Sequence, residues 1–300
     1  MKKIFTLVIT LISVTTFAQT ENLVDLPVSN EKYTAHNKGK FFIYWGGNRE
    51  TYSTSDIRFS GENYDFVVHN AEAKDKPKGY HIDYINPARM TIPQTNFRLG
   101  YFINDYYNIS IGVDHMKYVF NQNQIANVSG FVNLPVTDNG SIYNGVYDNT
   151  PIDFYTNYSS NDTDTPPPFL TFEHTDGLNY INTEFSRVDD ISSKLFKSWN
   201  SDKIQINATE GFGAGILLPK TNTRLLGKDR YDEFHISGFG ISAKAGLTFT
   251  FFKRFFIQTE LKGGYIEMNN IRTTQFKTDK AEHNFWFLQS VIAVGGIFKL

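Results

Sequence analysis

The sequence has no cysteine, no long apolar run beyond its N-terminus and no marked excess of charge of either sign. Without cysteine there is no disulfide framework, no thiolate nucleophile and no cysteine-bound zinc. Without an apolar run of about 18 residues, a membrane-spanning helix in the mature chain is excluded. With 29 basic against 31 acidic residues, the chain also lacks the electrostatic footprint of a nucleic-acid-binding protein.

The first 18 residues have the organisation of a secretory signal peptide. Lys2 and Lys3 form a basic start, residues 4–16 are apolar or carry hydroxyl groups, and Thr16 and Ala18 supply small residues before a cleavage point. We expect cleavage after Ala18 and export from the cytoplasm. Residues 19–39 are polar and without a pattern, and we expect them to form a periplasmic N-terminal tail.

Most of the remaining chain alternates between apolar and polar or small residues, in segments of about ten residues with aromatic ends. Helical periodicity is nearly absent. The clearest alternation covers residues 235–251. One set is Phe239, Ile241, Ala243, Ala245, Leu247, Phe249 and Phe251, and the other is Gly238, Gly240, Ser242, Lys244, Gly246, Thr248 and Thr250. The first set suits a lipid-facing surface and the second suits a narrow polar lumen.

These segments predict an all-β fold, a closed antiparallel up-and-down transmembrane β-barrel formed by residues 40–300. Short turns at 104–106 and 252–254 mark the periplasmic side, because outer-membrane barrels have short periplasmic turns and long outer loops. Eight strands are expected, with ten or twelve as the second choice. They cover 41–47, 95–103, 107–118, 178–189, 203–217, about 235–251, 255–265 and 284–300.

Two of the expected outer loops, about 48–93 and 119–177, are too long to lack structure. Alternating pieces at 64–68 and 125–131 indicate that each loop adds a hairpin or extends the barrel above the membrane. Aromatic residues gather at the ends of the strands, as is typical of membrane interfaces. Phe102, Phe251 and Phe256 map to the periplasmic end, and Tyr265 and Trp286 map nearer the outer end.

With its signal peptide, its alternating strands and a last segment ending Gly296-Ile297-Phe298-Lys299-Leu300, the chain resembles small Gram-negative outer-membrane β-barrels of OmpA-type or OmpW-like architecture. Such barrels usually end on an aromatic residue, whereas this chain ends on Leu300. The resemblance implies residence in the cell outer membrane, contact with outer-membrane lipid, and insertion by the barrel assembly machinery.

Strict alternation points six charged side chains into the lumen. They are Arg98, Lys244 and Lys262, and Asp114, Glu184 and Glu260. An eight-stranded barrel is only wide enough for side chains to fill it, and buried charges must be paired. We therefore expect an ion-paired plug, with a narrow gated pore as the alternative.

Glu210 interrupts an otherwise apolar outward set, Ile204, Ile206, Phe212, Ala214 and Ile216. A carboxylate facing lipid is costly, so we expect a bulge near Gly211 to rotate Glu210 into the ion-paired network. The enzymatic alternative is a lipid-modifying site that uses Glu210, Asp114 or His115. It lacks an adjacent nucleophile and base.

No metal-binding motif or cofactor motif is present, because the seven histidines show no HxH or HxxxH spacing. We therefore expect no catalytic residue, no metal and no cofactor. The favoured function is a structural or surface-binding role through the long outer loops, with an extracellular ligand, glycan or protein as partner. A pore, a lipid-modifying enzyme and a soluble secreted barrel with an apolar interior are the alternatives.

Overall fold

A computed structural model of the protein describes residues 36–79, 81–85, 93–156, 166–196 and 203–300. The chain divides into two units, residues 1–34 and 35–300, and the description below concerns the second. The expected signal peptide and residues 19–35 of the expected tail lie outside the described residues. No helix among the described residues is long and apolar enough to cross a membrane.

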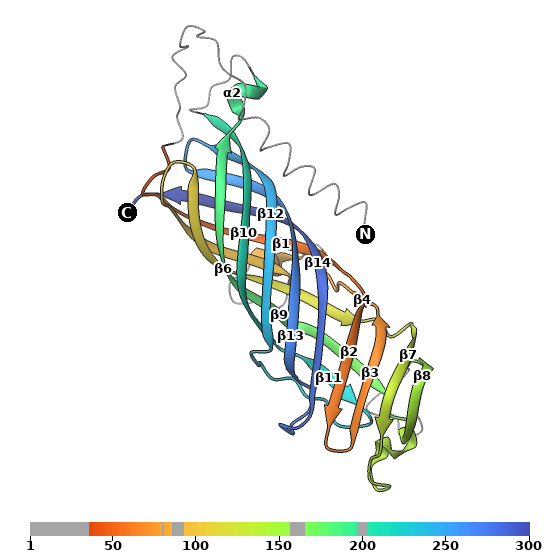
Figure 1. Cartoon of the computed structure of the whole chain (residues 1–300). Coiled ribbons are helices and arrows are strands. Elements are labelled where there is room, and N and C mark those ends of the chain that lie inside the picture. The colour runs from red at the N-terminus through yellow and green to blue at the C-terminus, as the bar shows by residue number, and fades with distance from the viewer. Residues whose placement is uncertain (1–35, 80, 86–92, 157–165, 197–202) are drawn as a thin grey trace, which may run out of the picture. The chain divides into compact units, whose positions relative to one another are not determined.

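Eight long strands form one antiparallel ring, as predicted. In spatial order they are β1 (Phe41–Tyr52), β5 (Thr95–Phe102), β6 (Tyr107–Phe120), β9 (Leu170–Asp190), β10 (Ile204–Pro219), β12 (Gly238–Phe251), β13 (Phe255–Arg272) and β14 (Lys280–Phe298). The ring closes because β14 pairs with β1 along the whole of β1, from Phe41 opposite Phe298 to Tyr52 opposite Phe287. Figure 1 shows these strands wrapping around a common axis.

The register of the ring fixes its width. Starting at Phe41, each residue can be followed to the residue opposite it on the next strand. After all eight strands this path returns to β1 at Thr51, so the stagger of the ring is ten residues. Eight strands with this stagger tilt by about 40° from the barrel axis, so each residue rises about 2.5 Å along the axis. A barrel of this size has an interior that side chains can fill.

Side chains alternate between the lumen and the outside, and an apolar belt surrounds the barrel. On β13, Gln258, Glu260 and Lys262 are buried in the lumen, whereas Ile257 and Leu261 are 44% and 45% exposed. The outward set on β13 runs from Phe255 to Tyr265, which is about 25 Å along the axis. The other exposed apolar side chains of the belt include Ile43, Leu99, Ile109, Ile111, Phe212, Ile216, Phe239, Ile241, Leu247, Trp286, Ile292 and Val294.

One end of the barrel has short connections. Residues 103–106 join β5 to β6, and the side chain of Asn104 accepts hydrogen bonds from the backbone N–H groups of Tyr106 and Tyr107, both at 2.8 Å. Residues 252–254 join β12 to β13. The third connection at this end contains the short helix α2 (Ser192–Leu195), which lies at the same end of the barrel as the C-terminus in Figure 1. Both turns lie where the sequence predicted them.

The two long loops contain strands, which extend the sheet beyond the ring at the opposite end. β14 continues to β2 (Ser55–Gly61), β3 (Tyr64–Ala71), β7 (Ile125–Val132) and β8 (Gly145–Asp153) in that order. We name these four strands the extension; they gather at one end of Figure 1. Shorter elements are β4 (Ala73–Lys74), which pairs with β6, β11 (Asn222–Leu225), which pairs with β9, and the 3-10 helices η1 (Ile82–Ile85) and η3 (Asn139–Tyr143).

The interior changes character along the axis. Between the extension and the upper parts of β6, β9, β13 and β14, the core is apolar and aromatic, with Phe59 stacked on Phe66 at 5.4 Å and packed edge-on against Phe172. At the short-turn end, Phe42, Tyr44, Phe102 and Phe256 form a second, smaller cluster inside the barrel. Phe102 and Phe256 therefore point into the lumen, not toward the belt.

Candidate functional site: the filled lumen

Between these two apolar clusters, six charged side chains occupy the middle of the lumen. Arg98 comes from β5, Asp114 from β6, Glu184 from β9, Lys244 from β12, and Glu260 and Lys262 from β13. All six are buried, and Arg98, Asp114, Glu184 and Lys262 are 0% exposed. They converge because each occupies an inward position of its strand at a similar level of the tilted ring.

Glu184 is the centre of this charge layer. Its carboxylate lies 2.9 Å from Arg98, 2.5 Å from Lys244 and 2.8 Å from Lys262. Asp114 lies 2.7 Å from Lys262 and 3.5 Å from Arg98, and Glu260 lies 2.9 Å from Lys244. Three cations thus face three anions, and each cation contacts at least two anions. Desolvating these groups is expensive, so the layer depends on every charge keeping its partners.

Neutral groups complete the charge layer. Arg98 donates to the Tyr44 hydroxyl at 3.0 Å and to the amide oxygen of Asn182 at 2.8 Å. The Asn182 amide in turn donates to Asp114 at 3.0 Å. These bonds fix the orientation of the guanidinium group and of the carboxylate that faces it.

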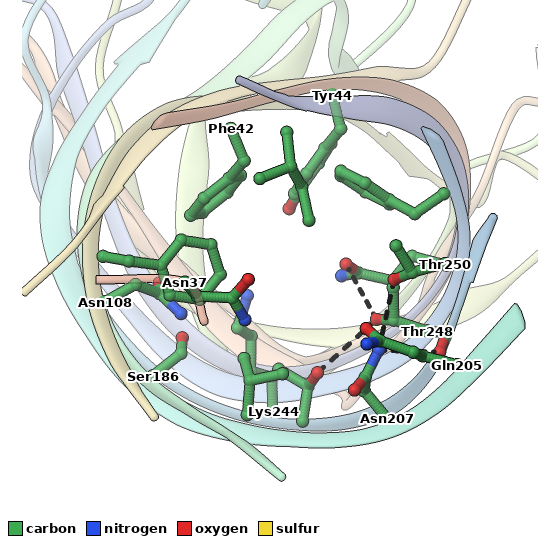
Figure 2. Close-up of a pocket in the computed structure, with 16 residues that line it drawn as sticks. Asn37, Phe42, Tyr44, Asn108, Ser186, Gln205, Asn207, Lys244, Thr248 and Thr250 are labelled. Atoms are coloured by element: carbon green, nitrogen blue, oxygen red, sulfur yellow. Dashed lines mark hydrogen bonds between the residues drawn. The ribbon is translucent and has the colours of Figure 1, made fainter. Parts of the chain in front are cut away.

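On the short-turn side of the charge layer, a small cavity remains. Figure 2 shows it between Phe42 and Tyr44 on one wall and Lys244, Gln205 and Asn207 on the other. Its volume is about 40 Å³, which holds a few water molecules but no organic ligand. Most of the lining residues carry hydroxyl or amide groups, which can bind water, although the aromatic cluster supplies much of the exposed lining.

On the opposite side of the charge layer lies a layer of amides and acids. Asn96 donates to Asp114 at 2.6 Å, and Asn48 donates to Asn96 at 2.7 Å. Gln289 donates to Glu50 at 2.9 Å. This layer connects the charge layer to the rim of the barrel.

Next along the axis is an aromatic layer that includes two buried histidines. His174 of β9 and His283 of β14 have ring centroids 5.9 Å apart, and Tyr118 lies against both. Each Nδ1 meets a hydroxyl group, Thr221 at 2.9 Å for His174 and Ser55 at 3.4 Å for His283, whereas both Nε2 atoms are buried without a hydrogen-bond partner. Burial lowers the pKa of His174 to about 3 and that of His283 well below its ordinary value, so both rings are neutral.

Glu210 does not join the charge layer, and the expected bulge is absent. The pairing of β10 with β9 and β12 runs without a shift past Gly211, so Glu210 faces outward with Phe212. Its partner in the register is Arg187, which also faces outward and holds Asp189 at 2.7 Å. Arg187 thus forms its ion pair with Asp189, and Glu210 acts on its guanidinium group only as a further nearby negative charge.

Asp114 and His115 do not form a catalytic pair. Asp114 points into the lumen toward Lys262, whereas the His115 Nδ1 atom bonds to Asn179 at 2.8 Å. Glu210 is on the outer surface of another strand. The three residues of the enzymatic alternative are therefore not assembled into one site.

Three groups in the lumen were missed by the sequence argument, namely Glu50, His174 and His283. Glu50 lies inward on β1 in the same alternation as Phe42, Tyr44 and Asn48. It would have been found had the first strand been continued past residue 47. The described residues contain no group of three or more His, Asp or Glu side chains placed to hold a metal ion.

The fold and this lumen define the chain as an eight-stranded antiparallel β-barrel with an apolar exterior and a charged interior. Among solved structures it is similar to the outer-membrane protein OprG of Pseudomonas aeruginosa, with 9% identity over 89% of this chain and 99% of that one, at a TM-score of 0.37. Neisserial surface protein A matches at 10% identity over 88% and 98% of the two chains, with a TM-score of 0.29. The Ail protein of Yersinia pestis matches at 12% identity over 85% and 99%, with a TM-score of 0.26.

No protein-family model matches the chain, and no curated protein is similar to it in sequence. At the TM-scores above, the role of a neighbour cannot be carried over to this chain. Its function has to be argued from its own geometry.

Proposed function

We propose that this protein is a non-enzymatic outer-membrane β-barrel that does not conduct and that presents its extension outside the cell as a binding surface. The apolar belt of about 25 Å matches the hydrocarbon band of an outer-membrane barrel. The short-turn end is the periplasmic side, and the extension then lies on the outer side. Cleavage of a signal peptide after Ala18 is part of this proposal.

The observation that carries the proposal is the filling of the lumen at successive levels. The small aromatic cluster, the charge layer, the amide layer and the aromatic layer follow one another along the axis. Glu184, Asp114 and Lys262 in the middle are each 0% exposed, as are Tyr118 and His174 above them. A conducting path would have to pass all of these levels, each of which is occupied by packed or ion-paired side chains.

The extension carries the features expected of a binding surface. β8 is the last strand of the extended sheet, so one of its edges has no neighbouring strand among the described residues. Around the adjoining tip, Phe131, Val136, Ile142 and Val146 expose 44%, 91%, 61% and 86% of their surface. Exposed apolar groups on ordered loops are where partners bind, and these favour a protein partner over a glycan.

Single-channel recording tests the closed lumen. Purified protein, folded in detergent and shown by heated against unheated gel mobility to be a barrel, is added to a planar bilayer. We expect the mobility shift and no stable openings. Steady conductance steps would refute the closed lumen and favour the narrow pore.

Site-specific photocrosslinking on whole cells tests the binding surface. A crosslinker at Val146 should capture a partner, and one at Ile292 within the belt serves as the matched exposed position that should not capture it. Equal capture at both positions, or none at Val146, would contradict a role for the tip.

A further inference from the structure

We propose that an apolar groove on the outer wall of the barrel, at its short-turn end, binds one phospholipid with a negatively charged headgroup. The acyl chains lie in the groove, and basic side chains at its edge bind the headgroup phosphate. The inference rests on the proposed placement of the barrel in the membrane, with the short-turn end on the periplasmic side. It is independent of the binding surface on the extension.

The groove crosses five neighbouring strands of the ring, which are β5, β1, β14, β13 and β12. Its volume is about 700 Å³, within the range of about 300–1,000 Å³ that ligand-binding clefts have. Its lining consists of apolar residues, aromatic residues and glycine, among them Ile43, Trp45, Phe251, Phe255, Val294 and Gly296. A groove of this composition within the apolar belt suits a hydrocarbon chain and not a polar ligand.

Gly296 keeps the groove open, although the packing does not require glycine there. It is an outward position of β14, opposite Ile43 on one side and Phe255 on the other. A Cβ atom at Gly296 would meet only the backbone oxygen of Arg254, at 3.5 Å, which is an ordinary contact. A larger side chain would therefore fit at this position, and it would fill the groove.

Basic residues stand at the ends of the strands that line the groove. Lys40 directly precedes β1, and Lys299 directly follows β14. Lys253 and Arg254 belong to the turn between β12 and β13. Burial, followed by the nearby positive charges of Lys253 and Lys299, lowers the pKa of Lys40, whereas Asp105 acts in the opposite direction. The three lysines are therefore close enough to act together on one anion.

The charge at this edge identifies the class of ligand. Among the residues that the structure describes, Lys40, Arg254 and Lys299 form no ion pair. Clusters of lysine and arginine at a membrane surface attract anionic headgroups. An apolar groove with a cationic edge thus matches the two parts of an anionic phospholipid. A second copy of the chain packed symmetrically on this face would bring like charges together, which opposes that occupant.

Native mass spectrometry of the full chain tests the inference. Protein folded in a non-ionic detergent is first shown to change its gel mobility on heating, and phosphatidylglycerol is then titrated into the micelles, with phosphatidylcholine as the comparison. We expect one saturable phosphatidylglycerol per barrel, bound at least tenfold more tightly than phosphatidylcholine. Lys40→Gln combined with Lys299→Gln should weaken binding of phosphatidylglycerol about tenfold.

Gly296→Leu fills the groove and should weaken binding of phosphatidylglycerol at least tenfold, with the gel-mobility shift unchanged. Gly263→Leu is the matched control, because Gly263 is an outward glycine of β13 that does not line the groove, and a Cβ atom there meets nothing closer than 3.8 Å. Lys280→Gln, at the opposite end of β14 from Lys299, is the control for charge. Both control variants should bind phosphatidylglycerol like the unchanged protein.

A barrel that shows the mobility shift but binds no phosphatidylglycerol overturns the inference and leaves the proposed function intact. Equal binding by Gly296→Leu and Gly263→Leu, or binding of many lipids without saturation, overturns it as well, because lipid then covers the belt without a specific site. A dimer that Gly296→Leu converts to a monomer would assign the groove to a second copy. Absence of the mobility shift in the unchanged protein would refute the proposed barrel and this inference together.

Discussion

Replacing Glu184 by glutamine removes the centre of the charge layer while keeping its shape. Three cations lie within 2.9 Å of its carboxylate, and the change leaves them facing only Asp114 and Glu260. Loss of one partner from a buried ionic network costs about 3–5 kcal/mol, because an uncompensated charge remains in the interior. We expect the free energy of unfolding to fall by that amount.

The chain offers a matched control and a rescue. Glu210→Gln makes the same chemical change on the outer surface, where Arg187 already holds Asp189, and should alter stability by about 1 kcal/mol or less. Lys244→Met added to Glu184→Gln restores equal numbers of charges, two against two, and should recover at least half of the loss. Urea titrations of protein refolded in micelles, followed by tryptophan emission, measure all four proteins. Equal effects of Glu184→Gln and Glu210→Gln would refute the assignment of the charge layer.

Three further predictions concern the two buried histidines, the turn after β12 and the wall of the barrel. In the folded protein the pKa of His174 and that of His283 lie below the ordinary value of about 6.5. Their contribution to the free energy of unfolding is therefore present above that pH and is lost as the pH falls. The free energy of unfolding should drop by about 2 kcal/mol between pH 7 and pH 5 on account of His174, and further on account of His283, and His174→Asn should reduce this slope in parallel titrations. Lys253 has a φ of 61° in the turn after β12, so Lys253→Gly should stabilise the barrel by about 0.5–1 kcal/mol in the urea assay. At Gly295 a methyl group would overlap the backbone oxygen of Ile43 and the ring of Phe256, so Gly295→Ala should cost about 1–3 kcal/mol and reduce the heat-stable fraction on gels.

The sequence predicted the ring better than the extension, because the apolar residues of an alternating segment face outward in the ring and inward in the extension. Within the belt, outward residues are apolar and inward ones are polar or charged, as on β13. Beyond the belt the pattern inverts: Ile57 and Phe59 of β2 are buried, whereas Asp56 and Arg58 face water. The expected strand 178–189 therefore began eight residues late, since β9 starts at Leu170 where the inversion has already occurred.

For the charged residues too, the sequence indicated which face of the strand a side chain occupies but not which residue lies beside it. Alternation alone placed Arg98, Asp114, Glu184, Lys244, Glu260 and Lys262 on the inner face, where the structure brings them together. It gave no means of placing Glu210 opposite Arg187, because that placement depends on the register between β9 and β10. Register depends on the closure of the whole ring, which no local pattern encodes.

β14 pairs with three other strands, and this constrains the order in which parts of the protein can fold. β14 contacts β13 and β1 in the ring and is also the strand to which β2 attaches, with Lys280 opposite Ser60. These two residues are 220 positions apart in the sequence. The hairpin of β2 and β3 therefore cannot pair with the ring until β14 has been synthesised and has folded. Contacts of such long range are slow to form. The extension is therefore expected to form last, and a chain that lacks β14 would lose the attachment of the extension together with the closure of the ring.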